Sequence, residues 1–426
     1  MSDIEAVRAQ RSTRPSPRRR SGFVTATALA AAIVSSPVSA RPAAATPVVD
    51  DSPDLSFYSA PDDRIPGPPG SIIQIRAVIG DPALPNARNY LLLYRSVDMH
   101  GMPVAVSGTV SVPQGSPPPG GWPLISWAHG TTGVADVCAP SLDSSELYPA
   151  HDYTALVRRV QARWIAAGYA VAQTDYQGLG TPGPHGYLIG TAEQRAVTDM
   201  ARAARELEPE IGKRWVAMGH SQGGQAAIFA NAQAQEWAPE LRLLGAVALA
   251  PASHQGVGLQ AAQLATVAGI PSAGASLAGE STAFLPLIIR GAQTVADIDP
   301  GRFLTAHTTA MVSLADASCI GGLRGPQAWG GLAMNEVFDS EGDMSALTRV
   351  LDENDPSALT FTRPLLVLQG RDDTVVPAVA TDSLVAKQRL AGQPVQYRGY
   401  AGADHRAVLE ASYDDALLWV NARFAD

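Results

Sequence analysis

The chain has 426 residues and a formal net charge of −9, with 46% hydrophobic and 17% charged residues. This composition excludes an intrinsically disordered chain and provides enough apolar residues for a large core. The charge is uneven, because residues 1–40 carry six Arg against Asp3 and Glu5, which leaves −13 on residues 41–426. An acidic body without a basic stripe excludes nucleic acid as an expected partner, and it excludes docking on anionic lipid headgroups by charge alone.

Residues 1–40 are predicted to be an export signal. Arg18–Arg20 form a positive segment, an apolar run follows from Phe23 to Val34, and Val38–Ala40 offers the small residues that a signal peptidase recognises. The apolar run is too short for a bilayer span of about 20 residues. The alternatives are an N-terminal anchor and a basic tail, and the paired Arg leave Sec and twin-arginine export both open. We expect a secreted protein, cleaved after Ala40, without a membrane span in the mature chain.

The segment that follows the signal is predicted to lead irregularly into the fold. Residues 41–70 are rich in Pro, Ala and Asp. Ile72–Val78 and Tyr90–Val112 then alternate apolar and polar residues, which predicts opening antiparallel strands.

Beyond residue 122 the sequence alternates short apolar runs with segments of helical periodicity. The runs predicted as strands are Pro123–Ala128, Tyr169–Gln173, Trp215–Met218, Leu243–Ala250, Leu365–Leu368 and Val395–Tyr400. The predicted helices are Tyr153–Gly168, Ala192–Leu207, Gln222–Trp237, a helix after Pro377, and Ala407–Phe424. This order predicts an α/β fold with a mostly parallel central sheet and helices on both faces.

The alternation stops between residues 252 and 345, where Ala-rich helical stretches are broken by Gly and Pro. We interpret residues 71–251 and 346–426 as the catalytic domain and 252–345 as a helical cap inserted into it. Three apolar stretches of the cap, Val267–Ile270, Phe284–Ile289 and Ala310–Leu314, either line a substrate cleft or pack on one another. An apolar cleft would favour lipid-like esters.

A nucleophilic serine is indicated by the pentapeptide Gly219-His220-Ser221-Gln222-Gly223, which lies between a predicted strand and a predicted helix. A GxSxG pentapeptide is a short pattern that arises by chance, so its context carries the argument. A sharp strand-to-helix turn needs small flanking residues, here Gly219 and Gly223, to present the Ser221 hydroxyl above the sheet. The alternative is a Gly-rich turn with a structural serine.

Serine needs a base to take its proton and an acid to orient that base. Asp372 and Asp373 follow the strand Leu365–Leu368, and the Gly-x-x-Asp-x-x-Val-Pro spacing favours Asp373. His405 follows the strand Val395–Tyr400 and completes the order Ser, Asp, His. The alternative for His405 is a surface residue that caps a helix.

The negative charge that develops on a carbonyl oxygen requires N–H donors. One is expected from the backbone of Gln222, the residue after the nucleophile. The other is expected from Thr131, in the loop His129-Gly130-Thr131-Thr132-Gly133 after the strand Pro123–Ala128. That loop could also be an ordinary glycine turn.

The exported part contains two cysteines, Cys138 and Cys319. In an oxidising compartment a lone pair favours a disulfide, with two buried thiols as the alternative. The sequence has no HExxH and no CxxC, so we expect neither a metal nor another cofactor.

Several segments of the chain together resemble the secretory lipases, the family typified by Candida antarctica lipase A, in their actinobacterial branch. The segments that carry the resemblance are Trp127–Gly133, Cys138–Ser141, Asp175–Gly180, Gly219–Gln225, Glu353–Pro356, and Gly370–Pro377 with His405. The resemblance implies an α/β-hydrolase fold with a helical cap after the sixth strand. It also implies lipase or carboxylesterase activity without a cofactor, with Ser221 as nucleophile, Asp373 as acid and His405 as base. The few cysteines depart from the family pattern.

The expected function is an exported serine ester hydrolase that cleaves carboxylic esters, with acylglycerols as the expected substrates and lipid surfaces as transient contacts. The alternatives are a short-chain esterase, a peptidase or thioesterase on the same fold, and a hydrolase-fold binding protein without catalysis. The sequence contains all the candidate catalytic residues, Ser221, Asp373 and His405. This favours the ester hydrolase over the binding protein, because a non-catalytic relative usually lacks one of the three.

Overall fold

The computed structural model describes residues 55–267 and 281–425, which belong to one compact unit, Ser52–Asp426. The expected export signal, residues 41–54 of the expected irregular segment, and residues 268–270 of one apolar stretch lie outside the described residues. Two short 3-10 helices, Ser56–Tyr58 and Asp62–Arg64, precede the sheet. Phe57 and Tyr58 are buried against the first strands.

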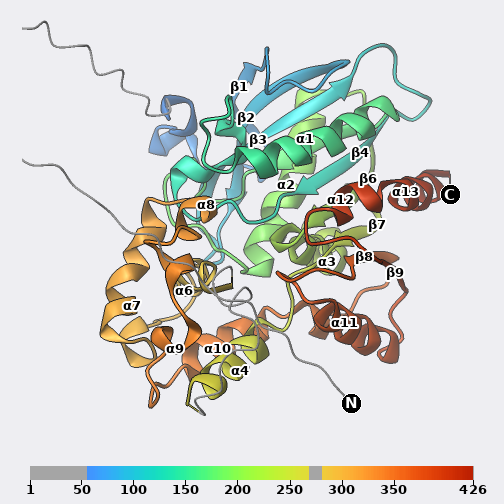
Figure 1. The fold of residues 1–426 in the computed structure, drawn as a ribbon. Coiled ribbons are helices and arrows are strands. Elements are labelled where there is room, and N and C mark those ends of the chain that lie inside the picture. Colours follow the sequence, from blue (N-terminus) through green and yellow to red (C-terminus); the bar gives the residue numbers. More distant parts are fainter. Residues whose placement is uncertain (1–54, 268–280, 426) are drawn as a thin grey trace, which may run out of the picture. The chain divides into compact units, whose positions relative to one another are not determined.

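A nine-stranded mixed sheet forms the centre of the described chain (Figure 1). Its strands are β1 (Ile72–Ala77), β2 (Ala87–Val97), β3 (Pro103–Pro113), β4 (Trp122–Ala128), β5 (Ala170–Thr174), β6 (Ile211–His220), β7 (Arg242–Leu249), β8 (Leu365–Gly370) and β9 (Val395–Tyr400). The spatial order is β1-β2-β3-β5-β4-β6-β7-β8-β9. The pairs from β1 to β5 are antiparallel and all others are parallel, so the predicted mostly parallel sheet is confirmed.

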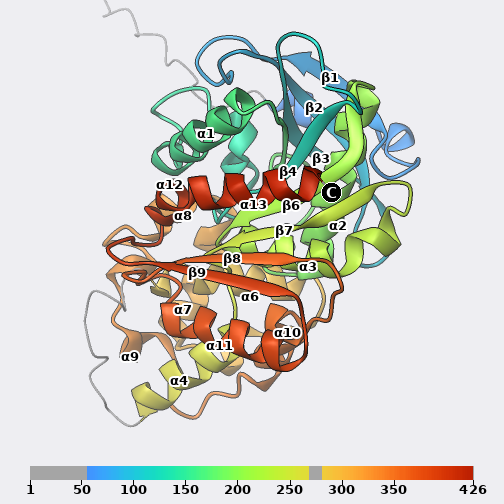
Figure 2. The same ribbon diagram turned by 90° about the vertical axis from the view of Figure 1, so that its right-hand side faces the viewer.

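Helices cover both faces of this sheet, as the alternation predicts. One face carries α1 (His151–Ala166), α12 (Val408–Ala411) and α13 (Tyr413–Ala425), and the other carries α2 (Gly190–Leu207), α3 (Gln222–Trp237) and α11 (Ala378–Leu390). Figure 2 shows α12 and α13 lying across the first face. Neighbouring strand residues point to opposite faces, so Ile125 packs towards α1 and Leu124 towards α2. Burial on both faces explains why the central strands are continuous apolar runs.

The last helix differs from its prediction. The periodicity predicts one helix over Ala407–Phe424, whereas the structure has α12 and α13 with a break at Ser412. The buried Ser412 Oγ donates to the carbonyl oxygen of Val408 at 2.6 Å. A serine side chain that bonds its own backbone competes with the helical ladder, and this favours a break.

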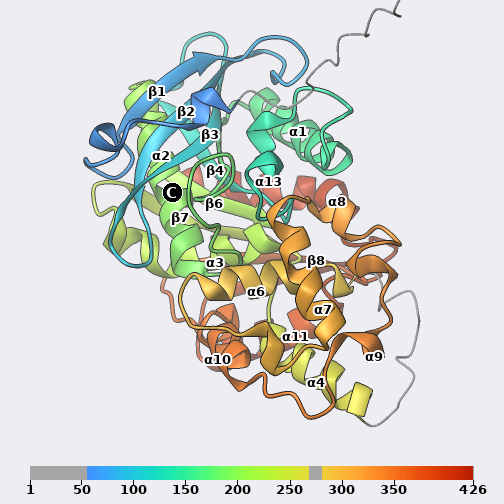
Figure 3. The same cartoon turned by 90° about the vertical axis from the view of Figure 1, so that its left-hand side faces the viewer.

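A group of helices lies between β7 and β8 and gathers at one end of the sheet (Figures 1 and 3). They are α4 (Gln255–Val267), α6 (Leu285–Gln293), α7 (Ala306–Met311), α8 (Ile320–Leu323), α9 (Met334–Val337) and α10 (Ser345–Glu353). They share an apolar cluster, which includes Leu287, Trp329 and Leu347 and extends to Tyr187–Ile189 before α2. The resemblance to secretory lipases implies a cap after the sixth strand, and in this chain the strand that directly precedes these helices is β7. We propose that they form the cap, and that it ends after α10, because α10 packs on α4 and α6.

Candidate active site

Ser221 occupies the turn between β6 and α3, with φ of 59° and ψ of −117°. A non-glycine residue adopts such angles only where the surrounding structure enforces them. The flanking glycines are required because a side chain at either position would have no room. A Cβ on Gly219 would lie 2.2 Å from the carbonyl oxygen of Gly223, and a Cβ on Gly223 would lie 1.9 Å from that of Ala128. The close packing of this turn therefore fixes the direction in which Ser221 points.

His405, in the connection between β9 and α12, contacts both other members of the expected set. Its Nε2 lies 2.9 Å from Ser221 Oγ, and its Nδ1 lies 2.8 Å from Asp373 Oδ2. In this arrangement a neutral imidazole can accept the serine proton at Nε2 while its Nδ1–H donates to the carboxylate. Ser221 is 7% exposed and the Asp373 side chain is fully buried, so bulk water does not compete for these contacts.

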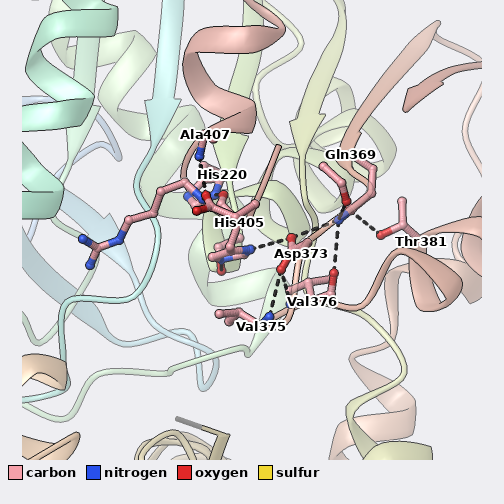
Figure 4. A network of polar contacts seen from close by, with 12 residues as sticks. His220, Gln369, Asp373, Val375, Val376, Thr381, His405 and Ala407 are labelled. Atoms are coloured by element: carbon pink, nitrogen blue, oxygen red, sulfur yellow. Dashed lines mark hydrogen bonds and ion pairs between the residues drawn. The ribbon is translucent and has the colours of Figure 1, made fainter. Parts of the chain in front are cut away.

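The carboxylate of Asp373 is held from several sides (Figure 4). Its Oδ1 accepts hydrogen bonds from the backbone N–H groups of Val375 and Val376, at 2.9 and 2.8 Å. Its Oδ2 accepts from Gln369 Nε2 at 2.9 Å, in addition to the bond from His405. Four donors therefore fix the orientation of the carboxylate towards His405.

Two neighbouring acids lie apart from these contacts. Asp372 is exposed, and the structure brings Asp373, the acid that the spacing favours, against His405. Asp404 is also exposed, and its Oδ1 accepts from the backbone N–H groups of Arg406 and Ala407 at 2.9 and 2.8 Å. Asp404 therefore caps the turn that leads into α12.

The two expected N–H donors come from Thr131 and Gln222. The preceding N–H in the loop, that of Gly130, donates to Tyr153 Oη at 2.7 Å and is not available. Within the described part of the chain, neither the Thr131 nor the Gln222 backbone N–H donates to a protein acceptor. Both remain available to a substrate oxygen.

His220 has a role that the sequence did not predict. Its Nε2 lies 2.7 Å from the carbonyl oxygen of His405, and its Nδ1 lies 3.1 Å from Tyr153 Oη. Burial is the main cause that lowers the pKa of His220 well below its usual value, and the nearby His405 adds to it. A neutral His220 therefore donates to His405 and accepts from Tyr153. The only signal in the sequence is its position next to the nucleophile.

Glu193, in the first turn of α2, is a buried carboxyl group that was not predicted from the sequence. Its Oε1 accepts from Gln222 Nε2 at 2.8 Å and from the Leu188 backbone N–H at 3.0 Å. Burial raises the pKa of Glu193 to about 8, against the lowering effect of these two hydrogen bonds. A glutamate in a helical segment normally indicates a solvated face, so the sequence carried no signal for this contact.

Ser221 opens into a cavity of about 610 Å³. Its walls come from the segment before α2, from α4 and α6, from the residue after α9, and from the β8–α11 connection. They include Ala262, Phe284, Leu285, Ile288, Phe338 and Val376. The stretch Phe284–Ile289 fulfils both roles considered for it. Phe284, Leu285 and Ile288 line the cavity, whereas Leu287 and Ile289 are buried and, like Leu285 and Ile288, belong to the apolar cluster of the inserted helices.

The inserted helices are tied to the loop that carries Thr131. Cys138 and Cys319 form a disulfide, and the Ile320 backbone N–H donates to the carbonyl oxygen of Thr132 at 2.8 Å. These two links join the start of α8 to the loop after β4.

Over 55–267 and 281–425, no three His, Cys, Asp or Glu side chains are grouped so that they could ligate a metal ion. Across the same two ranges, every helix is too short or too polar to cross a bilayer.

The fold and its connections define an α/β-hydrolase: a mixed sheet covered on both faces, with a strand-turn-helix serine followed in the chain by an acid and a histidine. A model of the secretory lipase family matches residues 158–426. The chain belongs to the secretory lipase family, as its resemblance implies.

Among curated relatives, a Mycobacterium tuberculosis protein named "Probable inactive lipase" is 25% identical over 381 residues, or 87% of this chain and 82% of that protein. Lipase A of Moesziomyces aphidis is 30% identical over 236 residues, which cover 54% of this chain and 48% of that lipase. The trichothecene C-3 esterase of Fusarium sporotrichioides is 23% identical, covering 87% and 83% of the two chains. Lipases and esterases thus both occur among the relatives.

Solved structures support the same fold. Candida antarctica lipase A in its closed state superposes with a TM-score of 0.68 at 19% identity, covering 87% of this chain and 86% of that one. The rice cell wall degrading esterase LipA of Xanthomonas oryzae gives 0.62 at 17% identity, covering 82% and 95%. Family and fold together support an ester hydrolase.

Proposed function

We propose that the protein is an exported serine ester hydrolase that works through an acyl-enzyme. One observation carries this proposal: Ser221, His405 and Asp373 form a continuous hydrogen-bonded chain at the wall of an apolar cavity. The family and the fold agree with it.

In the proposed mechanism, Ser221 Oγ attacks the ester carbonyl carbon while His405 Nε2 takes the hydroxyl proton. Asp373 holds the imidazole at Nδ1 and stabilises its positive charge. The carbonyl oxygen becomes an oxyanion that accepts from the N–H groups of Thr131 and Gln222. When the C–O bond to the alcohol breaks, His405 returns the proton to the leaving oxygen. Water then attacks the acyl-enzyme while His405 takes its proton, the bond between the acyl carbon and Ser221 Oγ breaks, and His405 returns the proton to Ser221 as the carboxylic acid leaves.

The cavity beside Ser221 supports a proposal for the substrate class. Each methylene that leaves water for an apolar wall gains about 0.8 kcal/mol, so selectivity rises with acyl length until the cavity ends. A volume of about 610 Å³ lies within the usual range for small-ligand sites, about 300–1,000 Å³. We therefore propose acylglycerols with extended acyl chains as substrates.

The substrate proposal is tested by kcat/KM for p-nitrophenyl esters from acetate to palmitate, together with an emulsified triglyceride. We expect kcat/KM to rise beyond butyrate and the triglyceride to be hydrolysed. A steady fall beyond butyrate, with no triglyceride hydrolysis, would reject the lipase proposal and leave a short-chain esterase.

The cavity can be narrowed from α4 with a matched control on the same helix. Ala262 lines the cavity, whereas its neighbour Ala261 is exposed and does not. Ala262→Phe should lower kcat/KM for long-chain esters and leave that for butyrate nearly unchanged. Ala261→Phe should keep the chain-length profile of the wild-type protein.

A second candidate is a hydrolase-fold protein that does not catalyse, and it is favoured by the name of the Mycobacterium tuberculosis relative. A fluorophosphonate probe separates the two candidates, because it reacts only with an activated serine. We expect one label per chain, located by mass spectrometry on the peptide that contains Ser221. A folded protein that takes up no label would favour the non-catalytic candidate.

Export is proposed from the family and from the disulfide, since disulfides persist in oxidising compartments. N-terminal sequencing of the protein recovered from culture medium should begin at Arg41. Retention inside the cell with an intact N-terminus would contradict this proposal.

A further inference from the structure

The segment from His185 to Glu193 contacts both residues that supply the proposed oxyanion donors. Tyr187 Oη lies 2.7 Å from Thr131 Oγ1. Glu193 Oε1 accepts from Gln222 Nε2 at 2.8 Å, and His185 Nε2 lies 3.0 Å from the same nitrogen. One short segment thus reaches two loops that are about ninety residues apart in sequence.

The contacts at Gln222 are consistent in their donors and acceptors. His185 Nδ1 lies 2.8 Å from the carbonyl oxygen of Gln177, so Nδ1 carries the proton and Nε2 accepts. Burial lowers the pKa of His185 to about 3, which keeps the ring neutral. Both protons of the Gln222 amide therefore have acceptors, one on His185 and one on Glu193.

The segment itself is held in a strained conformation. Leu188 has φ of 59°, which a branched aliphatic residue adopts only under constraint. Its N–H donates to Glu193 Oε1 at 3.0 Å, and its carbonyl oxygen accepts from Gln225 Nε2 at 3.2 Å. Tyr187 and Leu188 also line the cavity beside Ser221. The segment is thus bonded to α3 through Gln225, and it forms part of the cavity wall.

We propose that residues 185–193 position the oxyanion hole, with Tyr187 holding the Thr131 loop and Glu193 holding Gln222. This proposal rests on the proposed function. Tyr187 and Glu193 are positioning residues, because they act through Thr131 and Gln222 and not on the substrate. Glu193 is 1% exposed and Tyr187 is 4% exposed, so neither is placed for another role at the surface.

The first test compares Tyr187→Phe, Thr131→Val and the double variant with p-nitrophenyl butyrate. Deleting an oxyanion donor costs about 10²–10³ in kcat, so a donor that is only less well positioned should cost about tenfold. We expect each single variant to lower kcat about tenfold with KM nearly unchanged. The double variant should lose no more than either single one, because both break the same contact.

A transition-state mimic distinguishes positioning from general destabilisation. An alkyl trifluoromethyl ketone adds to serine, and its oxyanion occupies the proposed hole. Its inhibition constant should rise by the same factor as kcat falls in Tyr187→Phe. Tyr169→Phe is the matched control: it also removes a hydroxyl contact, the 2.5 Å bond to Asn421 Oδ1, and it should leave kcat and inhibition unchanged.

The proposed role of Glu193 in holding Gln222 is tested by comparing a variant that removes the acceptor oxygen with one that keeps it. Glu193→Ala leaves Gln222 Nε2 without one acceptor and should lower kcat about tenfold, whereas Glu193→Gln keeps an acceptor oxygen and should restore most of it. The proposal is overturned if a folded Tyr187→Phe protein keeps kcat and the inhibition constant within about twofold of wild type, or if the losses in the double variant add. It is also overturned if a folded Glu193→Ala protein keeps kcat within about twofold of wild type. A wild-type protein that hydrolyses no ester overturns the proposed function as well.

Discussion

The ring of His220 packs on the ring of His405, with centroids 4.5 Å apart, and donates from Nε2 to the carbonyl oxygen of His405 at 2.7 Å. On its other side His220 accepts from Tyr153 Oη, which in turn accepts from the Gly130 N–H. This chain connects the backbone of the proposed base to the loop that carries the first oxyanion donor. It requires a neutral His220, because a protonated ring could not accept from Tyr153.

The first prediction concerns this contact. His220→Ala should lower kcat by about tenfold or more, because the carbonyl of His405 loses its buried donor. His220→Gln should recover part of the loss, since its amide can donate to the same oxygen. Steady-state kinetics on p-nitrophenyl butyrate measure both variants. Equal kcat values for His220→Ala and the wild-type protein would contradict a positioning role for His220.

The second prediction separates the two adjacent acids. Asp373→Asn should lower kcat by about 10³–10⁴-fold, because an amide cannot hold the required tautomer or stabilise the imidazolium. Asp372→Asn makes the same chemical change at an exposed position in the same loop, and it should stay within about twofold of wild type. If the loss fell on Asp372→Asn instead, the proposed acid would be the wrong one.

Much of this arrangement could be predicted from the sequence. The helix Gln222–Trp237 has the predicted bounds, because Ser221 precedes its first residue and Pro239 follows two residues after its last. The order Ser221, Asp373, His405 followed from loops at the ends of predicted strands. These features depend on local sequence, where periodicity and small residues carry the information.

The supporting contacts could not be predicted in the same way. His220 and the carbonyl of His405 are 185 positions apart in the chain, and Glu193 and Gln222 are 29 apart. A buried glutamate and a solvated one look alike in a helical segment, since only the packing of α2 against α3 decides which it is. The break at Ser412 was missed because it depends on a side chain that bonds its own backbone.

The third prediction concerns stability and pH. The pKa of Glu193 is raised from an ordinary value of 4.5 to about 8, so its contribution to stability is complete below about pH 4.5 and is lost as pH rises towards 8. The titratable groups around it stay uncharged over this range, since burial raises the pKa values of Tyr176 and Tyr187 and lowers that of His185. Glu193→Gln replaces the carboxyl group with an amide that does not ionise, so this loss of stability with pH is absent from the variant.

Thermal unfolding of the wild-type and Glu193→Gln proteins at pH 5, 6.5 and 8 measures this effect. The Tm of Glu193→Gln minus that of the wild-type protein should increase as pH rises, because the two proteins share all other titrating groups. A Tm difference that is the same at all three pH values would show that Glu193 does not titrate as proposed.

The fourth prediction concerns the disulfide between Cys138 and Cys319, which are 181 positions apart. On the chain-entropy model, closing a loop of this length is worth about 5 kcal/mol, and measured values are often lower. Thiol titration of the unfolded, unreduced protein should find no reactive thiol, and reduction should lower Tm. Two reactive thiols per chain would mean that the bridge does not form.

The measurement that tests the central claim most directly is the turnover of p-nitrophenyl butyrate by Ser221→Ala. Removing the nucleophile should lower kcat by at least about 10⁴-fold, while circular dichroism and Tm stay close to those of the wild-type protein. Ser126→Ala is the matched control, because it removes another buried serine hydroxyl, bonded to the carbonyl oxygen of Val197 at 2.7 Å, and it should keep its activity. Undiminished turnover by a folded Ser221→Ala protein would contradict serine catalysis at this site.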